Sequence, residues 1–186
     1  MMYDYIIVKG IGGKMSSSLG YVIKLKDALE IYEPNVLRWI FTSTRPNTEF
    51  AISFDMDVLK IYEDFDKCER IYFDKEEINN EKEKDKQKRI YELSCIKIPK
   101  KIPEQQTFRH LTTLLQICEM NVDKTVKMFK IKNKERVECA KNWIEKYAPE
   151  ELKFKVVDKV KAKVSKENKE ALLELAERLE KKNYSE

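Results

Sequence analysis

The residues best suited to chemistry lie in residues 10–20, which read GIGGKMSSSLG. All four glycines of the protein fall in this stretch, together with Lys14 and the serines Ser16, Ser17 and Ser18. A backbone rich in glycine can wrap its N–H groups around an anion, and the hydroxyls and the lysine ammonium add further donors. The stretch therefore predicts a phosphate-binding loop. The alternative is a solvated surface loop, because a short motif also arises by chance in a Lys-rich chain.

The composition sets wide limits on the class of protein. The 186 residues suffice for one domain or two small ones, and the net charge of +4 permits nucleic-acid binding without requiring it. No apolar run reaches membrane-spanning length, and the N-terminus lacks the pattern of a signal peptide. We therefore expect a soluble cytoplasmic protein without membrane contact.

The four cysteines, Cys68, Cys95, Cys118 and Cys139, are widely spaced and form no C-x-x-C pair. The chain has a single histidine, His110, so zinc ligation is not expected and we predict no metal site. Scattered thiols of this kind are typical of small core residues in a reducing compartment. His110 itself is predicted to be a hydrogen-bonded helix residue rather than a catalyst.

The elements that position the glycine-rich stretch follow from local pattern. Residues 3–8 are rich in β-branched and aromatic types and predict a strand, with a short return strand at 21–23. Helical spacing predicts a helix over 25–32 and a second one that begins at Pro34. Strand, loop and helix in close succession favour the phosphate-binding interpretation.

The rest of the chain predicts helices. A brief extended segment at 50–54 precedes a helix to about residue 73, capped by Asp55. Residues 74–89 are almost wholly polar and predict the solvated, partly disordered tip of a helical hairpin, which resumes packing at 90–93. Beyond a junction marked by Pro99 and Pro103, the pattern predicts a bundle of short helices. Its apolar stripes lie at 108–118, 122–129, 137–147 and 172–179, with Asn121 or Asp123, Asn133 and Ser165 as caps.

Basic residues of the second half suggest contact with nucleic-acid phosphates. Lys127, Lys130 and Lys134 could share one face, although such spacing is usual in any Lys-rich helix. Lysines at 153–163 alternate with apolar residues, and there a solvated surface is the favoured interpretation.

Several runs together resemble the class I lysyl-tRNA synthetase family. Residues 14–18, KMSSS, resemble the KMSKS loop of class I aminoacyl-tRNA synthetases, with serine in place of the second lysine. The later matches separate this family from its glutamyl- and cysteinyl-type relatives. The matching runs are GGKMSSS at 12–18, LEIYEP at 29–34, VLR at 36–38, TRPN at 44–47, LKIYEDFD at 59–66, RIYELS at 89–94, FRHL at 108–111 and NWIEKYAP at 142–149.

The resemblance implies a mainly α fold in three parts. Residues 1–26 would end a Rossmann catalytic domain, residues 27–98 would form a helical stem-contact region, and residues 99–186 would belong to a helical anticodon-binding domain. The implied reaction joins lysine to tRNA(Lys) through lysyl-adenylate, with ATP and Mg²⁺. The ATP site would comprise Gly12, Gly13, Lys14, Met15, Ser16, Ser17 and Ser18, of which Lys14, Ser16 and Ser17 would be catalytic, and tRNA would contact Arg45, Arg109, Lys127, Lys130 and Lys134.

Two departures limit the expected activity. Leu19 replaces a lysine common after the three serines, and the chain contains no HIGH-type motif. The resemblance places that motif and the lysine pocket before Met1, on the same or a separate chain, and places further anticodon-binding helices after Glu186. We therefore expect the isolated chain to form no adenylate and to charge no tRNA. Alternatives are a non-catalytic tRNA-binding paralogue or module, and a non-functional remnant.

Overall fold

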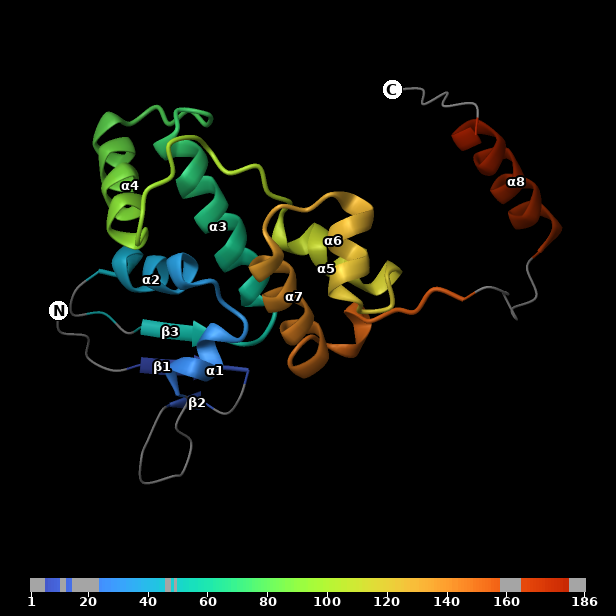
Figure 1. Ribbon diagram of the computed structural model, residues 1–186, viewed down its shortest axis with the longest axis horizontal. Helices are drawn as coiled ribbons and strands as arrows, with labels where there is room; N and C mark the ends of the chain where they lie inside the picture. Colours follow the sequence, from blue (N-terminus) through green and yellow to red (C-terminus); the bar gives the residue numbers. More distant parts are fainter. Residues whose placement is uncertain are drawn as a thin grey trace. The chain divides into compact units, whose positions relative to one another are not determined.

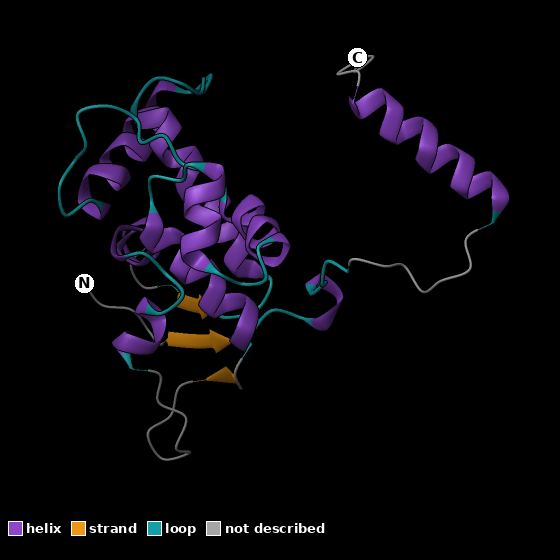
Figure 2. Ribbon diagram, turned by 45° about the vertical axis from the view of Figure 1, so that its right-hand side comes forward, coloured by secondary structure: helices purple, strands orange, loops and turns teal. Residues whose placement is uncertain are grey.

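The computed structural model describes residues 6–10, 13–14, 24–45, 48, 50–157 and 165–180. These residues are mainly helical, as the sequence predicts (Figures 1 and 2). They fall into two units, Met1–Val156 and Val157–Glu186.

A three-stranded sheet in the order β2-β1-β3 lies in the first unit (Figure 1). The central strand β1 (Ile6–Lys9) runs parallel to β3 (Phe50–Ser53) and antiparallel to β2 (Gly13–Lys14). The strand predicted over 3–8 thus extends to Lys9, and its first residues lie outside the described part. The predicted return strand at 21–23 lies outside it too. The strand β2 lies inside the stretch predicted to be a loop.

The first helix is shorter than its apolar spacing predicts. Helix α1 (Leu25–Leu29) ends three residues before the predicted end at residue 32. Glu33 precedes proline and has an extended ψ of 147°, because the proline ring disfavours a helical residue before it. Helix α2 (Pro34–Ser43) begins at Pro34, as predicted.

Helices α3 (Asp57–Tyr72) and α4 (Glu81–Ser94) form the predicted hairpin. The N-cap of α3 is Met56, one residue after the predicted Asp55, and no side chain caps the helix there. The Asp55 carboxylate still accepts the backbone N–H of the first helical residue, Asp57, at 3.0 Å. Residues 74–89 are exposed or half-buried, as predicted, but the tip of the hairpin is shorter than predicted, because the Asn80 side chain caps α4 and the helix begins at Glu81. The predicted apolar stripe of α3 is core: Val58, Tyr62, Phe65 and Cys68 are buried, and Ile61 and Tyr72 pack against them.

The remaining helices of the first unit are α5 (Phe108–Ile117), α6 (Val122–Phe129) and α7 (Lys134–Lys146), followed by a 3₁₀ turn at Glu150–Leu152. Asn121 caps α6 and Asn133 caps α7, each through its side-chain oxygen, as predicted. Residues on both sides of Pro99 and Pro103 share one core, so contacts alone mark no boundary there. The division at residues 26 and 98 stays a prediction.

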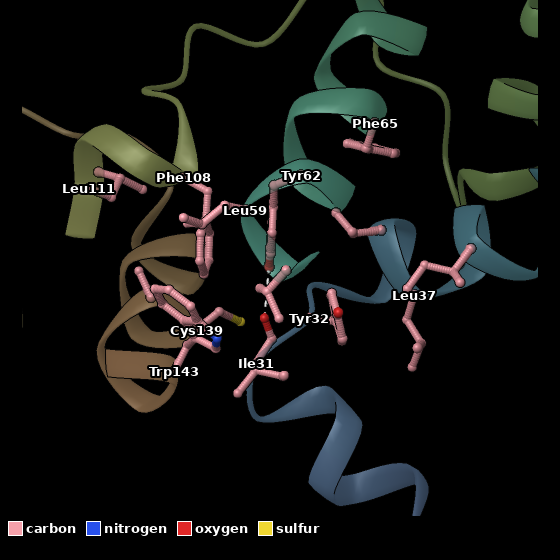
Figure 3. Close-up of a cluster of buried hydrophobic side chains, with 14 of the residues drawn as sticks. Ile31, Tyr32, Leu37, Leu59, Tyr62, Phe65, Phe108, Leu111, Cys139 and Trp143 are labelled. Atoms are coloured by element: carbon pink, nitrogen blue, oxygen red, sulfur yellow. Dashed lines mark hydrogen bonds between the residues drawn. The ribbon is translucent and has the colours of Figure 1, made fainter. Parts of the chain in front are cut away.

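The core of the first unit is aromatic and joins distant parts of the chain (Figure 3). The Tyr62 ring stacks on Phe108 with centroids 3.9 Å apart, and Phe108 meets the edge of Trp143 at 6.1 Å. The Tyr62 hydroxyl donates to the Ile31 carbonyl at 3.1 Å. Helices α3, α5 and α7 and the segment after α1 therefore share one packed centre.

The second unit contains helix α8 (Lys166–Glu180). Ser165 caps it as predicted, because the Ser165 hydroxyl accepts the Asn168 N–H at 3.2 Å. Its leucines Leu172, Leu173 and Leu175 are exposed.

Candidate functional site

The glycine-rich stretch begins at the carboxyl edge of the parallel pair β1 and β3. Because both strands run in the same direction, their last residues, Lys9 and Ser53, lie side by side in the register. The antiparallel strand β2 then places Gly13 beside Val8 and Lys14 beside Ile7. Open α/β sheets bind ligands outside the carboxyl ends of their strands. The turn that begins at Gly10 thus starts at the edge where a ligand is expected, and β2 then leads the chain back along β1, with Lys14 one register position further from that edge than Gly13.

Gly10 is required by packing rather than by a ligand. Its φ is +88°, a region that side-chain-bearing residues rarely adopt. A Cβ on Gly10 would lie 2.8 Å from the backbone nitrogen of Asp55, which is closer than real Cβ atoms come. Glycine at this position lets the end of β1 pack against the turn between β3 and α3. The sequence pattern alone had instead indicated that the glycines allow close approach of the backbone to a phosphate.

Charged side chains beside this edge neutralise one another. The Lys9 Nζ lies 2.9 Å from the Asp57 carboxylate, and both side chains are about half exposed. The hydrogen bond from Lys9 and the charge of Asp57 raise the pKa of the lysine. Lys9 is therefore engaged by the protein itself and offers little free charge to an anion.

The carboxyl end of β3 is held by two buried side-chain donors. The Tyr32 hydroxyl donates to the Ser53 carbonyl at 2.6 Å, and the Trp143 indole N–H donates to the Phe54 carbonyl at 3.0 Å. The Phe54 N–H in turn donates to the Lys9 carbonyl at 2.9 Å. The end of β1 that leads into the glycine-rich stretch is thus tied through β3 to α7.

A buried ion cluster, not identified from the sequence, lies at the start of α7. The Arg136 side chain is 1% exposed, and its guanidinium donates to Glu33 at 2.6 Å and to Asp66 at 2.9 Å. It also lies over the Tyr62 ring, with Cζ 5.1 Å from the centroid. Burial opposes its charge, but the two carboxylates outweigh burial and raise the pKa of Arg136. In the sequence these residues look like ordinary surface charges, since 103 positions separate Arg136 from Glu33.

The predicted ATP-binding residues are only partly described. The backbones of Gly13 and Lys14 form β2. The others, Gly12, Met15, Ser16, Ser17 and Ser18, lie outside the described residues.

The predicted tRNA-contacting residues lie on different elements. Arg45 is exposed just after α2, and Arg109 on α5 pairs with Glu63 at 2.8 Å. Lys127 on α6 and Lys130, which ends that helix in a left-handed conformation, are both exposed. Lys134 begins α7 and pairs with Asp123 at 2.9 Å. The three lysines thus lie on or at the ends of α6 and α7, which pack together, and the two arginines lie on other elements.

The four cysteines are buried and unpaired, which confirms their prediction as core residues. Burial raises the pKa of Cys68 to about 11 and that of Cys139 to about 12, so these thiols stay protonated at neutral pH. Within the described residues, no group of three or more His, Cys, Asp or Glu side chains is arranged to hold a metal ion. The described helices include none long and apolar enough to cross a membrane.

The first half of the chain, which contains the sheet and the glycine-rich stretch, matches a known protein family. Residues 1–97 match the family model of tRNA synthetases class I (K). The chain therefore belongs to the class I tRNA synthetases, in the family designated K.

Similar curated proteins carry the name lysine–tRNA ligase. The protein from Borrelia garinii is 50% identical over 98% of this chain, and that from Borreliella burgdorferi is 48% identical over the same share. The protein from Thermococcus kodakarensis is 38% identical over 97% of the chain. The chain spans about 36% of the length of these relatives.

Proposed function

We propose that this chain supplies the ATP-phosphate loop and the tRNA-facing helices for the attachment of lysine to tRNA(Lys) through lysyl-adenylate. The observation that carries the proposal is the family match over residues 1–97, which includes the KMSSS run that begins at Lys14 in β2. In this role Gly12, Gly13, Lys14, Met15, Ser16, Ser17 and Ser18 bind the triphosphate of ATP, and Mg²⁺ shares its charge when bound.

The chemistry of these residues suits that role. A lysine ammonium is a mobile point charge, and it stabilises the negative charge that develops on phosphate oxygens as pyrophosphate leaves. Because Lys9 is already paired with Asp57, Lys14 is the cation of this stretch assigned to the phosphates. Ser16 and Ser17 add hydroxyl donors, and the amino-acid pocket belongs to a HIGH-containing half, on the same or another chain.

The test is ATP–pyrophosphate exchange with lysine and tRNA. We expect no exchange from the chain alone, and exchange when a HIGH-containing half of a lysine–tRNA ligase is added. In the complemented reaction Lys14→Ala should lower kcat about 100-fold, the effect of losing one donor to a developing charge. Lys26→Ala is the matched control, since Lys26 is an exposed lysine of α1.

Two outcomes decide against the ligase role. An equal decrease in kcat in Lys14→Ala and Lys26→Ala would show that Lys14 has no specific role in the reaction. Absence of exchange with every complementing half, with tRNA binding retained, would leave a tRNA-binding module.

That module is the second candidate function. It is favoured by the exposure of Lys127 and Lys130 at the end of α6. If both lysines contact phosphates, each alanine substitution should lower the slope of log K against log[salt] by about one unit. Lys86→Ala is the control, because Lys86 already pairs with Glu83 on α4. An unchanged salt slope in both α6 variants would exclude these two contacts.

A further inference from the structure

Helix α7 binds two segments that lie far from it in the sequence. At its first turn, Arg136 holds Glu33. Near its end, the Asn142 side chain donates to the Glu30 carbonyl at 2.9 Å, and the Trp143 indole donates to the Phe54 carbonyl at 3.0 Å. The helix therefore spans from the start of α2 to the end of β3.

The hydrogen bond from Trp143 to Phe54 matters most because both residues are inaccessible to solvent. The Trp143 and Phe54 side chains are each 0% exposed, and the Trp143 ring packs against Phe108 (Figure 3). Without the indole donor, the Phe54 carbonyl would lose a bond that water cannot readily replace. The bond therefore holds the backbone of Phe54 in place, beyond what ring packing alone does.

The backbone of Phe54 is in turn bonded to the strand that enters the glycine-rich stretch. Its N–H donates to the Lys9 carbonyl at 2.9 Å, and the next residue, Asp55, packs against Gly10. A shift of Phe54 would therefore move the end of β1, and with it the start of the hairpin to β2. Tyr32 supports the same strand end through Ser53, and Asn142 supports the segment that carries Tyr32.

We propose that Trp143, with Asn142 as a second anchor, is a positioning residue for the hairpin that carries Lys14. The helical bundle then holds the end of β1 in place, and β1, β3 and α7 behave as one rigid piece. This inference rests on the proposed function for the role of Lys14, but its structural part stands apart from catalysis. Trp143 touches no reacting atom in this scheme and acts only through Phe54 and Lys9.

The first test is amide hydrogen exchange on the full chain. Trp143→Phe keeps an aromatic ring and removes the N–H donor. The expected result is exchange about tenfold faster at the Phe54 amide and along β1 and β3, with the amides of α4 unchanged as an internal reference. Trp39→Phe is the matched control, because Trp39 Nε1 is buried and forms no hydrogen bond with β1 or β3 among the described residues. It should leave exchange in β1 and β3 as it is.

Each other outcome overturns the proposal. Faster exchange in α4 and in β1 by the same factor would mean that Trp143 only stabilises the whole unit. Unchanged exchange at Phe54 and along β1 would mean that the indole bond positions nothing.

A second test uses the complemented ligation reaction. Trp143→Phe should raise the KM for ATP or lower kcat by about tenfold, with the KM for lysine unchanged, because the lysine pocket lies elsewhere. A rise in the KM for lysine alone would contradict a role in positioning the phosphate loop. If complementation gives no exchange with any half, the proposed function fails, and the hydrogen-exchange result still decides the positioning role.

Discussion

The guanidinium of Arg136 lies 2.9 Å from the carboxylate of Asp66 in the interior of the first unit. The pair joins α7 to α3, and the same arginine holds Glu33 at the start of α2. One side chain thus fixes the relative positions of three elements.

Removing this arginine should be strongly destabilising. Arg136→Met leaves Glu33 and Asp66 as buried carboxylates without a cation, and we expect a loss of about 3–5 kcal/mol in the free energy of unfolding. Urea denaturation measures it. Arg109→Met is the control, because Arg109 and Glu63 form an exposed pair worth about 0–1 kcal/mol. Similar losses in the two variants would show that the buried cluster contributes no more than a surface pair.

Stability should depend on pH through Glu69. Burial raises the pKa of Glu69 above its ordinary value of 4.5, although the hydrogen bond from Tyr91 opposes the shift. A carboxyl with a raised folded-state pKa binds its proton more tightly in the folded protein. Its contribution to stability is therefore largest at low pH and declines as the pH rises from about 4.5 through the folded-state pKa.

The measurement is urea denaturation of the wild type and Glu69→Gln at a series of pH values. The free energy of unfolding of the wild type, relative to the variant, should fall as the pH rises above about 4.5 and level off once the pH exceeds the folded-state pKa of Glu69. A difference that grows with pH would mean that the pKa of Glu69 is lowered in the folded protein.

The cap of α6 offers a local test. The Asn121 side chain accepts the Lys124 N–H at 2.9 Å, so Asn121→Ala should lower the free energy of unfolding by about 1 kcal/mol. Asn121→Asp keeps an acceptor and should be nearly neutral. Equal effects of the two substitutions in thermal denaturation would argue against a capping role.

Gly10 should not tolerate any side chain. Gly10→Ala places a Cβ against the Asp55 backbone and imposes a positive φ on alanine, so we expect a loss of at least about 1 kcal/mol. Gly10→Asn tolerates positive φ better but keeps the same contact, so it should not restore stability. Full recovery in Gly10→Asn would show that φ alone, and not the contact with Asp55, demands glycine here.

Much of the helical architecture was predictable because its signals are local. Apolar spacing within α3 and α5 and the caps Asn121 and Asn133 act within a turn or two of the residues concerned. The start of α4 was not predicted because its first two turns are almost wholly polar, although the Asn80 cap and the acidic residues Glu81 and Glu83 mark it locally. Resemblance to a family supplied the interpretation of the KMSSS run, which local pattern alone left open.

The sequence by itself thus determined most of the helices, the burial of the cysteines and the position of the glycine-rich stretch, since each follows from neighbouring residues. The tertiary structure decided which distant groups meet: β1 beside β3, Arg136 between Glu33 and Asp66, and Trp143 on Phe54. Such pairings leave no periodic pattern in the sequence. A charged residue or a tryptophan has the same sequence neighbours whether its side chain faces water or a partner about 100 residues away. Only the packed chain brings these partners within hydrogen-bonding distance.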